Sequence, residues 1–296
     1  MTQKFPRVSV GLPVYNGENF LVEAIDSILG QTYKDFELII SDNHSTDRTE
    51  EICRKYEARD DRVKYYRAEK NMGASWNFNR VVELASGEYF QWMAHDDVLA
   101  PTFIEKAVAV LDSDPTVVLA FSKTKFINEE GKYLKDYNYQ LDVESYQWSR
   151  RFVDLIVADQ IVVEIFGLMR ADVLWSTLPF GSYVGSDRVM LGELSLRGRF
   201  HKMPEPLFYH REHSNRSTKA NPSLQSRLKW FDTSKKNKIC FPSWKLLVEH
   251  LKSIRKSPLT RSQKIKCIVP MLMWIREKKK RMIEDLIFAL RPRVKN

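Results

Sequence analysis

Short apolar segments alternate with amphipathic ones along the first 112 residues of the chain. The apolar runs at residues 8–13, 36–40, 63–66 and 89–93 have the length and composition of buried strands. Between them, residues 19–29, 47–59, 73–85 and 101–112 place apolar side chains at helical spacing. This repeated strand–helix order, with short links, predicts an α/β fold with a mostly parallel central sheet flanked by helices.

The pattern is less regular after residue 112. We expect strands at residues 117–121 and 162–169, a helix start at 170–174 and a helix at 187–197. Residues 128–150 are polar and aromatic, which predicts a loop or hairpin. The expected organisation is one α/β domain over residues 1–218, with halves at 1–112 and 113–218, followed by a helical extension over 219–296.

Polar side chains follow three of the expected parallel strands. They are Pro13, Tyr15 and Asn16 after the first strand, Asp42 after the second, and Asp96 and Asp97 after the fourth. In an open α/β sheet, ligands bind at the carboxyl ends of the strands, and these ends should cluster on one rim. Two adjacent carboxylates at that rim suit a hard divalent cation, which often shares its oxygen ligands with substrate phosphates.

Charge distinguishes the C-terminal part from the rest. The net charge is +9, but residues 219–296 hold 21 Lys and Arg against 5 Asp and Glu, whereas the preceding residues have a net charge of −7. Ile283, Leu286, Ile287 and Leu290 lie on one helical face beside a run of basic residues. A basic amphipathic helix is typical of contact with an anionic membrane, but the same apolar face could pack on the catalytic domain or on a second subunit.

The chain shows no targeting or spanning segment. Its first residues lack the apolar core of a signal peptide, and the apolar run at 265–275 contains Lys266 and Pro270 and is too short to cross a bilayer. The three cysteines, Cys53, Cys240 and Cys267, have no metal-ligand spacing and favour a reducing compartment. We therefore expect a cytoplasmic protein that can lie at the inner face of the membrane.

Three motifs in order resemble those of the inverting glycosyltransferases of family 2, which have the GT-A fold. The motifs are VSVGLPVYNGENFLVEAIDSILGQTY, FELIISDNHSTDRT and NMGASWNFNRVVELASGEYFQWMAHDD, and the resemblance runs from about residue 8 to about residue 217. It implies a nucleotide-sugar donor held by residues 1–112, an acceptor half at 113–218, and a bound Mn²⁺ or Mg²⁺.

The resemblance also implies roles for single residues of the first half. Asp42 matches the acid that contacts the base of the nucleotide, and Pro13, Tyr15 and Asn16 lie in the loop that lines the nucleoside pocket. Asn71 opens the third motif and joins the donor-binding set. At the acidic motif, Asp97 is the expected metal ligand, and Asp96, a second candidate ligand, is expected nearer the ribose. Ala94 stands where many members carry a further acid.

In the second half, Asp187 resembles the family acid that opens a helix and acts as general base. Inversion needs such a base to take the proton of the attacking hydroxyl, and a carboxyl with a raised pKa would serve. The alternative is that Asp187 is only an acid in the first turn of a helix, where the helix dipole stabilises a negative charge. Further on, His213 could complete the metal shell and Arg211 could pair with phosphate oxygens.

The sequence thus predicts metal-dependent, inverting transfer of a sugar from a nucleoside-diphosphate sugar to a hydroxyl acceptor. The acceptor would be a saccharide or lipid-linked saccharide in cell-surface polysaccharide or glycolipid synthesis. A nucleotidyltransferase acting on a sugar phosphate is an alternative, but Gly11-Leu12-Pro13 is not the glycine-rich loop that such enzymes use. A third hypothesis is a non-enzymatic basic module that binds nucleic acid or an acidic polymer. No nucleic-acid-binding motif accompanies the basic residues, so we expect no nucleic acid partner.

Overall fold

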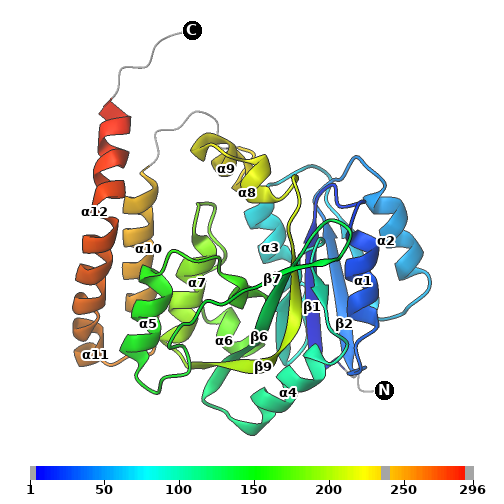
Figure 1. The fold of residues 1–296 in the computed structure, drawn as a ribbon, viewed down its shortest axis with the longest axis horizontal. Helices are drawn as coiled ribbons and strands as arrows, with labels where there is room; N and C mark the ends of the chain where they lie inside the picture. The colour runs from blue at the N-terminus through cyan, green and yellow to red at the C-terminus, as the bar shows by residue number, and fades with distance from the viewer. Residues whose placement is uncertain (1–4, 235–240, 291–296) are drawn as a thin grey trace.

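The computed structural model of the chain describes residues 5–234 and 241–290, and these form one sheet with helices on its faces (Figure 1). The strand order is β3-β2-β1-β4-β8-β6-β9-β5, and β7 pairs with β6 outside this path. The first elements are β1 (Val8–Val14), α1 (Leu21–Leu29), β2 (Phe36–Asp42), α2 (Thr49–Glu57), β3 (Val63–Arg67), α3 (Ala74–Glu83) and β4 (Tyr89–Trp92). Each predicted strand and helix of this half is confirmed, with ends that differ by a few residues.

The strands of the first half are parallel. β1 lies between β2 and β4, with Val14 opposite Asp42 at one end and Val8 opposite Tyr89 at the other. This register brings the ends of β1 and β2 to the same rim of the sheet, so the polar residues that follow them are neighbours.

The rest of the sheet, from β5 onward, is mixed. The elements that follow β4 are β5 (Val98–Leu99), α4 (Phe103–Ser113), β6 (Val117–Ile127), β7 (Tyr133–Asp136), α5 (Trp148–Val157), β8 (Leu168–Arg170), α6 (Ala171–Trp175), α7 (Ser186–Ser195) and β9 (Arg199–Arg211). β8 runs antiparallel to β4 and β6, β9 is parallel to β6, and β5 is antiparallel to β9. The chain therefore reverses direction at β8, as one expects where βα repeats stop.

Two predictions for this part of the chain were incomplete or wrong, and two strands were not predicted. Residues 162–169 are not one strand but a 3₁₀ turn (Val163–Phe166) followed by the short strand β8. At Gly167 an added Cβ would lie 2.7 Å from the Ala120 carbonyl oxygen, so the backbones approach too closely for another residue. The expected hairpin after residue 128 is present as β7, but α5 already begins at Trp148. β5 and β9 were not predicted, and Pro204 and Pro206 interrupt the alternation of β9.

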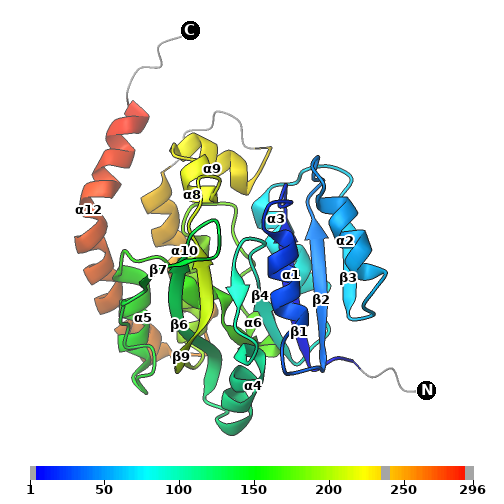
Figure 2. The ribbon, with the colours of Figure 1, turned by 45° about the vertical axis from the view of Figure 1, so that its right-hand side comes forward.

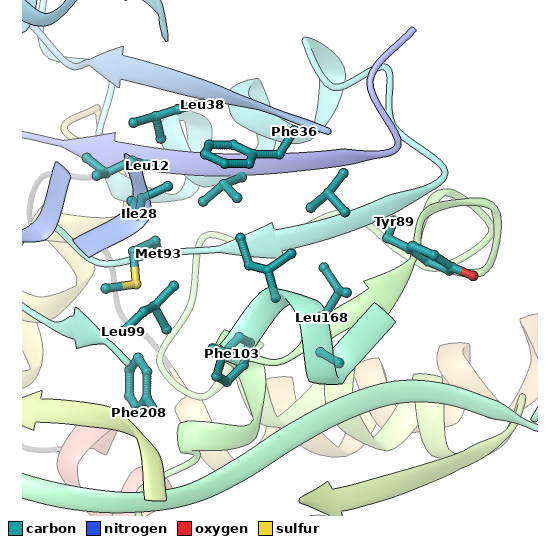
Figure 3. Close-up of a cluster of buried hydrophobic side chains, with 14 of the residues drawn as sticks. Leu12, Ile28, Phe36, Leu38, Tyr89, Met93, Leu99, Phe103, Leu168 and Phe208 are labelled. Atoms are coloured by element: carbon teal, nitrogen blue, oxygen red, sulfur yellow. The ribbon is translucent and has the colours of Figure 1, made fainter. Parts of the chain in front are cut away.

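The largest buried cluster lies between the sheet and helices α1 and α4. Figure 3 shows part of it, with Leu12, Leu38 and Met93 from the sheet side and Ile28 and Phe103 from the helices. Because this core fixes the strands next to the rim, it holds the loops that follow them in place.

The C-terminal segment is helical, as predicted. Its helices are α8 (Ser217–Ala220), α9 (Leu224–Phe231), α10 (Pro242–Lys256), α11 (Arg261–Lys266) and α12 (Ile268–Leu290). Figures 1 and 2 show α10 and α12 side by side at one edge of the molecule, against α5 and α7. Trp274 and Met271 of α12 are buried with Phe152 and Ile156 of α5, so one face of the extension packs on the preceding α/β part of the chain.

Within the described residues, no helix is both long and apolar enough to cross a membrane. Cys53 and Cys267 are buried free thiols, while Cys240 lies outside the described residues. The side chain of Leu290, predicted on the apolar face of the last helix, is also outside the described set.

Candidate active site

The loops after β1 and β2 are tied together by hydrogen bonds. The Asn16 backbone has a positive φ of 51°, which asparagine tolerates, and its side-chain oxygen accepts a hydrogen bond of 2.9 Å from the Thr46 amide. The Asn16 amide in turn donates to Ser45 Oγ at 2.9 Å. Tyr15 is exposed beside this junction, whereas Pro13 is buried in β1 and shapes the strand end.

Asp42 lies at the end of β2 and is fully enclosed. One carboxylate oxygen accepts from the Ser45 amide at 2.8 Å and the other from the Tyr65 hydroxyl at 2.7 Å. Burial and the Asp42 charge both raise the pKa of Tyr65, so this hydroxyl remains a donor. Asp42 thus orders the turn that follows β2, and its predicted contact with a nucleotide base stays a prediction.

Asparagines connect this rim with helix α3. Asn77 Nδ2 donates to the carbonyls of Val14 and Ser41 at 3.2 and 2.8 Å, and this bridges the ends of β1 and β2. Asn71 Oδ1 accepts from the Gly73 amide at 2.9 Å, and the Asn71 carbonyl accepts from Thr233 Oγ1 at 3.0 Å. Asn71 therefore links the segment before α3 to the segment that follows α9. Asn77 was not among the residues predicted from the sequence.

Asp96 and His213 form a close pair beyond β4. Their atoms Oδ2 and Nε2 are 2.8 Å apart, and the Phe20 ring packs 4.8 Å from the imidazole. The Asp96 side chain keeps 16% of its surface exposed. Burial alone would raise the pKa of Asp96, but the charges of the neighbouring histidines, His95 first, and the hydrogen bond of His213 hold it well below its usual range.

Asp97, which we expected to be a metal ligand, lies in a closed environment. Its side chain is fully buried, with His210 Nδ1 at 2.9 and 3.0 Å from its two oxygens and the Arg211 amide at 2.9 Å. The next residue, Val98, pairs with Tyr209 across β5 and β9, which brings this carboxylate against β9. Its two oxygens therefore already have partners within the protein, and the prediction that Asp97 is the first metal ligand stays a prediction.

Arg211 is also occupied by the protein. Its guanidinium is buried and donates to the Asp96, Asn128 and Glu129 carbonyls at 2.9, 3.0 and 3.0 Å, and it pairs with Glu23 of α1. The predicted phosphate contact is therefore not available in this arrangement. Arg211 instead joins α1, β9 and the acidic motif, while Arg216, 13% exposed, donates to His210 Nε2.

Asp187 occupies the first turn of α7, after Gly185 at φ 86°. Its carboxylate accepts a hydrogen bond of 2.8 Å from the adjacent Arg188 amide. Burial raises the pKa of Asp187 despite this bond and the nearby Arg188 charge. The loop before α7 is anchored on α3, since the Phe180 carbonyl accepts from Ser75 and Asn79 at 3.2 and 2.9 Å.

The fold brings most of the predicted residues to one rim. Gly17 packs against His95, so the loop after β1 reaches the acidic motif, and Phe20 of the same loop reaches His213. His210 was missed as the partner of Asp97, because only the β5–β9 pairing, which the sequence does not display, places them together.

The residues present fit a divalent ion held jointly with a ligand. No group of three or more His, Cys, Asp and Glu that could hold a metal occurs among the described side chains. Asp96 and His213, however, supply one carboxylate and one imidazole within 2.8 Å of each other, and Mn²⁺ and Mg²⁺ commonly complete such partial shells with phosphate oxygens and water.

Comparison with known proteins shows similarity to glycosyltransferases. The model of the family "Glycosyl transferase family 2" matches residues 9–177. An uncharacterized glycosyltransferase of Methanocaldococcus jannaschii is 36% identical over 134 residues, which is 45% of this chain and 46% of that protein. Another from Rickettsia typhi is 38% identical over 130 residues, 44% of this chain and 40% of that protein. The chain thus spans less than half the length of these curated relatives.

Solved structures share the fold at low identity. TarS of S. aureus, crystallised with UDP-GlcNAc, matches with a TM-score of 0.68 and 16% identity over 96% of this chain and 80% of that chain. The mannosyltransferase PcManGT of Pyrobaculum calidifontis, crystallised with GDP-Man and Mn²⁺, matches with a TM-score of 0.54 and 16% identity over 97% of this chain and 86% of that chain. This confirms the expected GT-A-like architecture.

Proposed function

Because the chain belongs to glycosyl transferase family 2, we propose that it transfers a sugar from a nucleoside-diphosphate sugar to a hydroxyl acceptor, with inversion, and that the reaction depends on a divalent metal. The observation that carries this proposal is the Asp96–His213 pair at the rim where β1, β2 and β4 end. In an open α/β sheet this rim is where ligands bind.

The donor would lie along that rim. We propose that Tyr15 and Asn16, with Pro13 and Asp42 behind them, line the nucleoside pocket, and that Asn71 closes its far side. Asp96 and His213 would hold Mn²⁺ or Mg²⁺ against the diphosphate. A bound ion would supply a Lewis acid that stabilises the charge of the departing diphosphate. Asp97 and Arg211 would keep Asp96 and the end of β9 in place.

Asp187 is proposed as the general base. Its raised pKa makes it a better proton acceptor than an ordinary carboxylate, and the attacking hydroxyl must lose its proton as the new bond forms. In a direct displacement the acceptor attacks opposite the leaving diphosphate, which gives inversion at the sugar.

The acceptor is proposed to be a saccharide or a lipid-linked saccharide, in cell-surface polysaccharide or glycolipid synthesis at the cytoplasmic face of a membrane. The basic extension, with a net charge of +16 over residues 219–296, supports a place near anionic lipid.

A panel of nucleotide-sugars tests the function through thermal stability, measured with and without Mn²⁺. A donor that binds the folded state raises the melting temperature by mass action, and we expect one nucleoside-diphosphate sugar to do so only when metal is present. The same donor should then be consumed when a suitable acceptor is added. If no nucleotide-sugar shifts the melting temperature under either condition, the proposal is wrong.

A further inference from the structure

Helix α12 has two opposite faces with different surroundings. One face packs against α5 through Met271, Trp274 and Met282, and Cys267 just before the helix joins this cluster; all four are at most 5% exposed. On the same side, Lys278 and Arg281 pair with Asp159 at 2.9 Å each. The helix is therefore anchored, and the apolar residues on its other side are not needed to attach it to the molecule.

The opposite side of α12 carries a row of exposed residues that we call the outer stripe. Its aliphatic members are 43% to 62% exposed, although side chains of this kind are usually buried. Exposed basic side chains interrupt the row near its middle. The outer stripe consists of Ile268, Val269, Leu272, Arg276, Lys279, Lys280, Ile283, Leu286 and Ile287.

We propose that the outer stripe is a membrane-binding surface that lies in the plane of an anionic lipid leaflet. The aliphatic side chains would enter the boundary between headgroups and acyl chains, and the lysines would extend their ammonium groups to lipid phosphates. An apolar row of this length on a soluble surface marks an interaction site, and the basic residues in it match anionic lipid in charge.

The charge distribution disfavours a second copy of the chain as the occupant. In a two-fold antiparallel helix pair, the middle of the outer stripe would face the middle of its partner. Arg276, Lys279 and Lys280 would then oppose the same three cations, while Glu277, which pairs with Arg276 at 3.2 Å, and Glu284 lie on the flank. A lipid leaflet, which supplies many anionic phosphates, has no such conflict.

The position of α12 makes such an orientation feasible. Figures 1 and 2 show the helix along the outer edge of the molecule, away from the sheet, so a flat surface could contact it without reaching the sheet. This inference is independent of which sugar, if any, the protein transfers.

Vesicle co-sedimentation of the full chain tests the proposal. We expect binding to vesicles of phosphatidylcholine with phosphatidylglycerol, and much weaker binding to phosphatidylcholine alone or at raised salt, because exposed charges are then screened. The double variant Leu272→Glu/Ile283→Glu places two negative charges on the outer stripe at exposed positions. It should bind at least roughly tenfold more weakly while its melting temperature stays unchanged.

A matched control places the same charges elsewhere. Phe5→Glu/Trp175→Glu changes two side chains that are 60% and 52% exposed and lie outside the extension, and it should bind like the wild type. Equal loss of binding in both double variants, or no binding of the wild type to anionic vesicles, would overturn the proposal. A wild-type dimer in analytical ultracentrifugation that only Leu272→Glu/Ile283→Glu dissociates, without vesicle binding, would assign the outer stripe to a second copy instead.

Discussion

The end of β4 and the start of α7 each present a carboxylate, and their surroundings push the two in opposite directions. Around Asp96, the charges of His95 and the other histidines and the hydrogen bond of His213 hold the pKa below the usual range, so the group stays ionised. Around Asp187, burial prevails and raises the pKa. A pair of acids whose environments separate their pKa values is typical of a site that divides two chemical tasks between them.

The two regions also differ in how firmly they are held. The acidic motif is fixed from several directions, since Asp97 accepts from His210 and from the Arg211 amide while Arg211 reaches α1. Asp187 makes one local hydrogen bond in its own helical turn. A ligand-holding site needs fixed geometry, whereas a base needs a carboxylate that is free to meet an incoming hydroxyl.

The largest effect is expected for Asp96→Asn. Loss of the carboxylate should remove metal-dependent donor binding and lower transfer by about a thousandfold, because the ion is worth several kcal/mol to the leaving group. Calorimetric titration of donor with Mn²⁺, together with a transfer assay, measures both quantities.

Asp97→Asn is the matched control for that change. Since Asp97 is buried and accepts from His210 and Arg211, its loss should lower the melting temperature more than Asp96→Asn does. If Asp97→Asn abolished metal-dependent binding and Asp96→Asn did not, the two roles would have to be exchanged.

Asp187→Asn should separate binding from chemistry. We expect donor affinity to stay unchanged and transfer to fall by at least about a hundredfold, the usual contribution of a general base. The pH dependence sharpens the test: wild-type transfer should rise with pH through the raised pKa of Asp187, and the variant should lose this acid limb. A fully active variant would remove Asp187 from the mechanism.

A smaller effect is expected at Glu164, a buried carboxyl near α7. Burial raises its pKa to about 7 from 4.5, and one of its oxygens has no hydrogen-bond partner within the part of the chain that the structure describes. The folded state then binds its proton more tightly than the unfolded state does. The contribution of Glu164 to the free energy of unfolding is complete below pH 4.5. It is lost as the pH rises through 7, and the total loss is about 3 kcal/mol.

Glu164→Gln tests this contribution. Chemical denaturation at several pH values should show a shallower decline of stability between pH 4.5 and 7 in the variant than in the wild type. Equal slopes for the two proteins would show that Glu164 does not titrate in this range. The pKa of Asp187 is raised as well, so Asp187 also contributes to the pH dependence of stability. Asp187→Asn is the control that separates the contribution of Asp187 from that of Glu164.

The first half of the fold could be predicted because its signals are local. Each strand is a short apolar run, each helix has its own apolar face, and parallel βα units place successive strand ends on one rim. The second half could not, because β9 is interrupted by Pro204 and Pro206 and gains its place only by pairing with β6 and β5. Residues 162–169 are apolar enough for a strand, but the chain turns at Gly167, where its backbone lies close to the Ala120 carbonyl.

The same division applies to the candidate site. The motifs placed Asp96, Asp97 and His213 in one region, and the structure brings them there. Which of the two acids remains available was decided by the β5–β9 register, which buries Asp97 against His210. Arg211 likewise carries the charge expected for a phosphate contact, but folding directs its guanidinium to carbonyls and to Glu23.

By itself, the sequence determined the family, the parallel first half and the chemical types gathered at its rim, because these depend on motifs and on the short-range spacing of apolar residues. Only the tertiary structure decided that Asp96 remains accessible while Asp97 is enclosed, and that α12 packs by one face and leaves the other open. These outcomes depend on contacts between segments more than a hundred residues apart, such as Asp96 with His213, whose geometry no local pattern encodes.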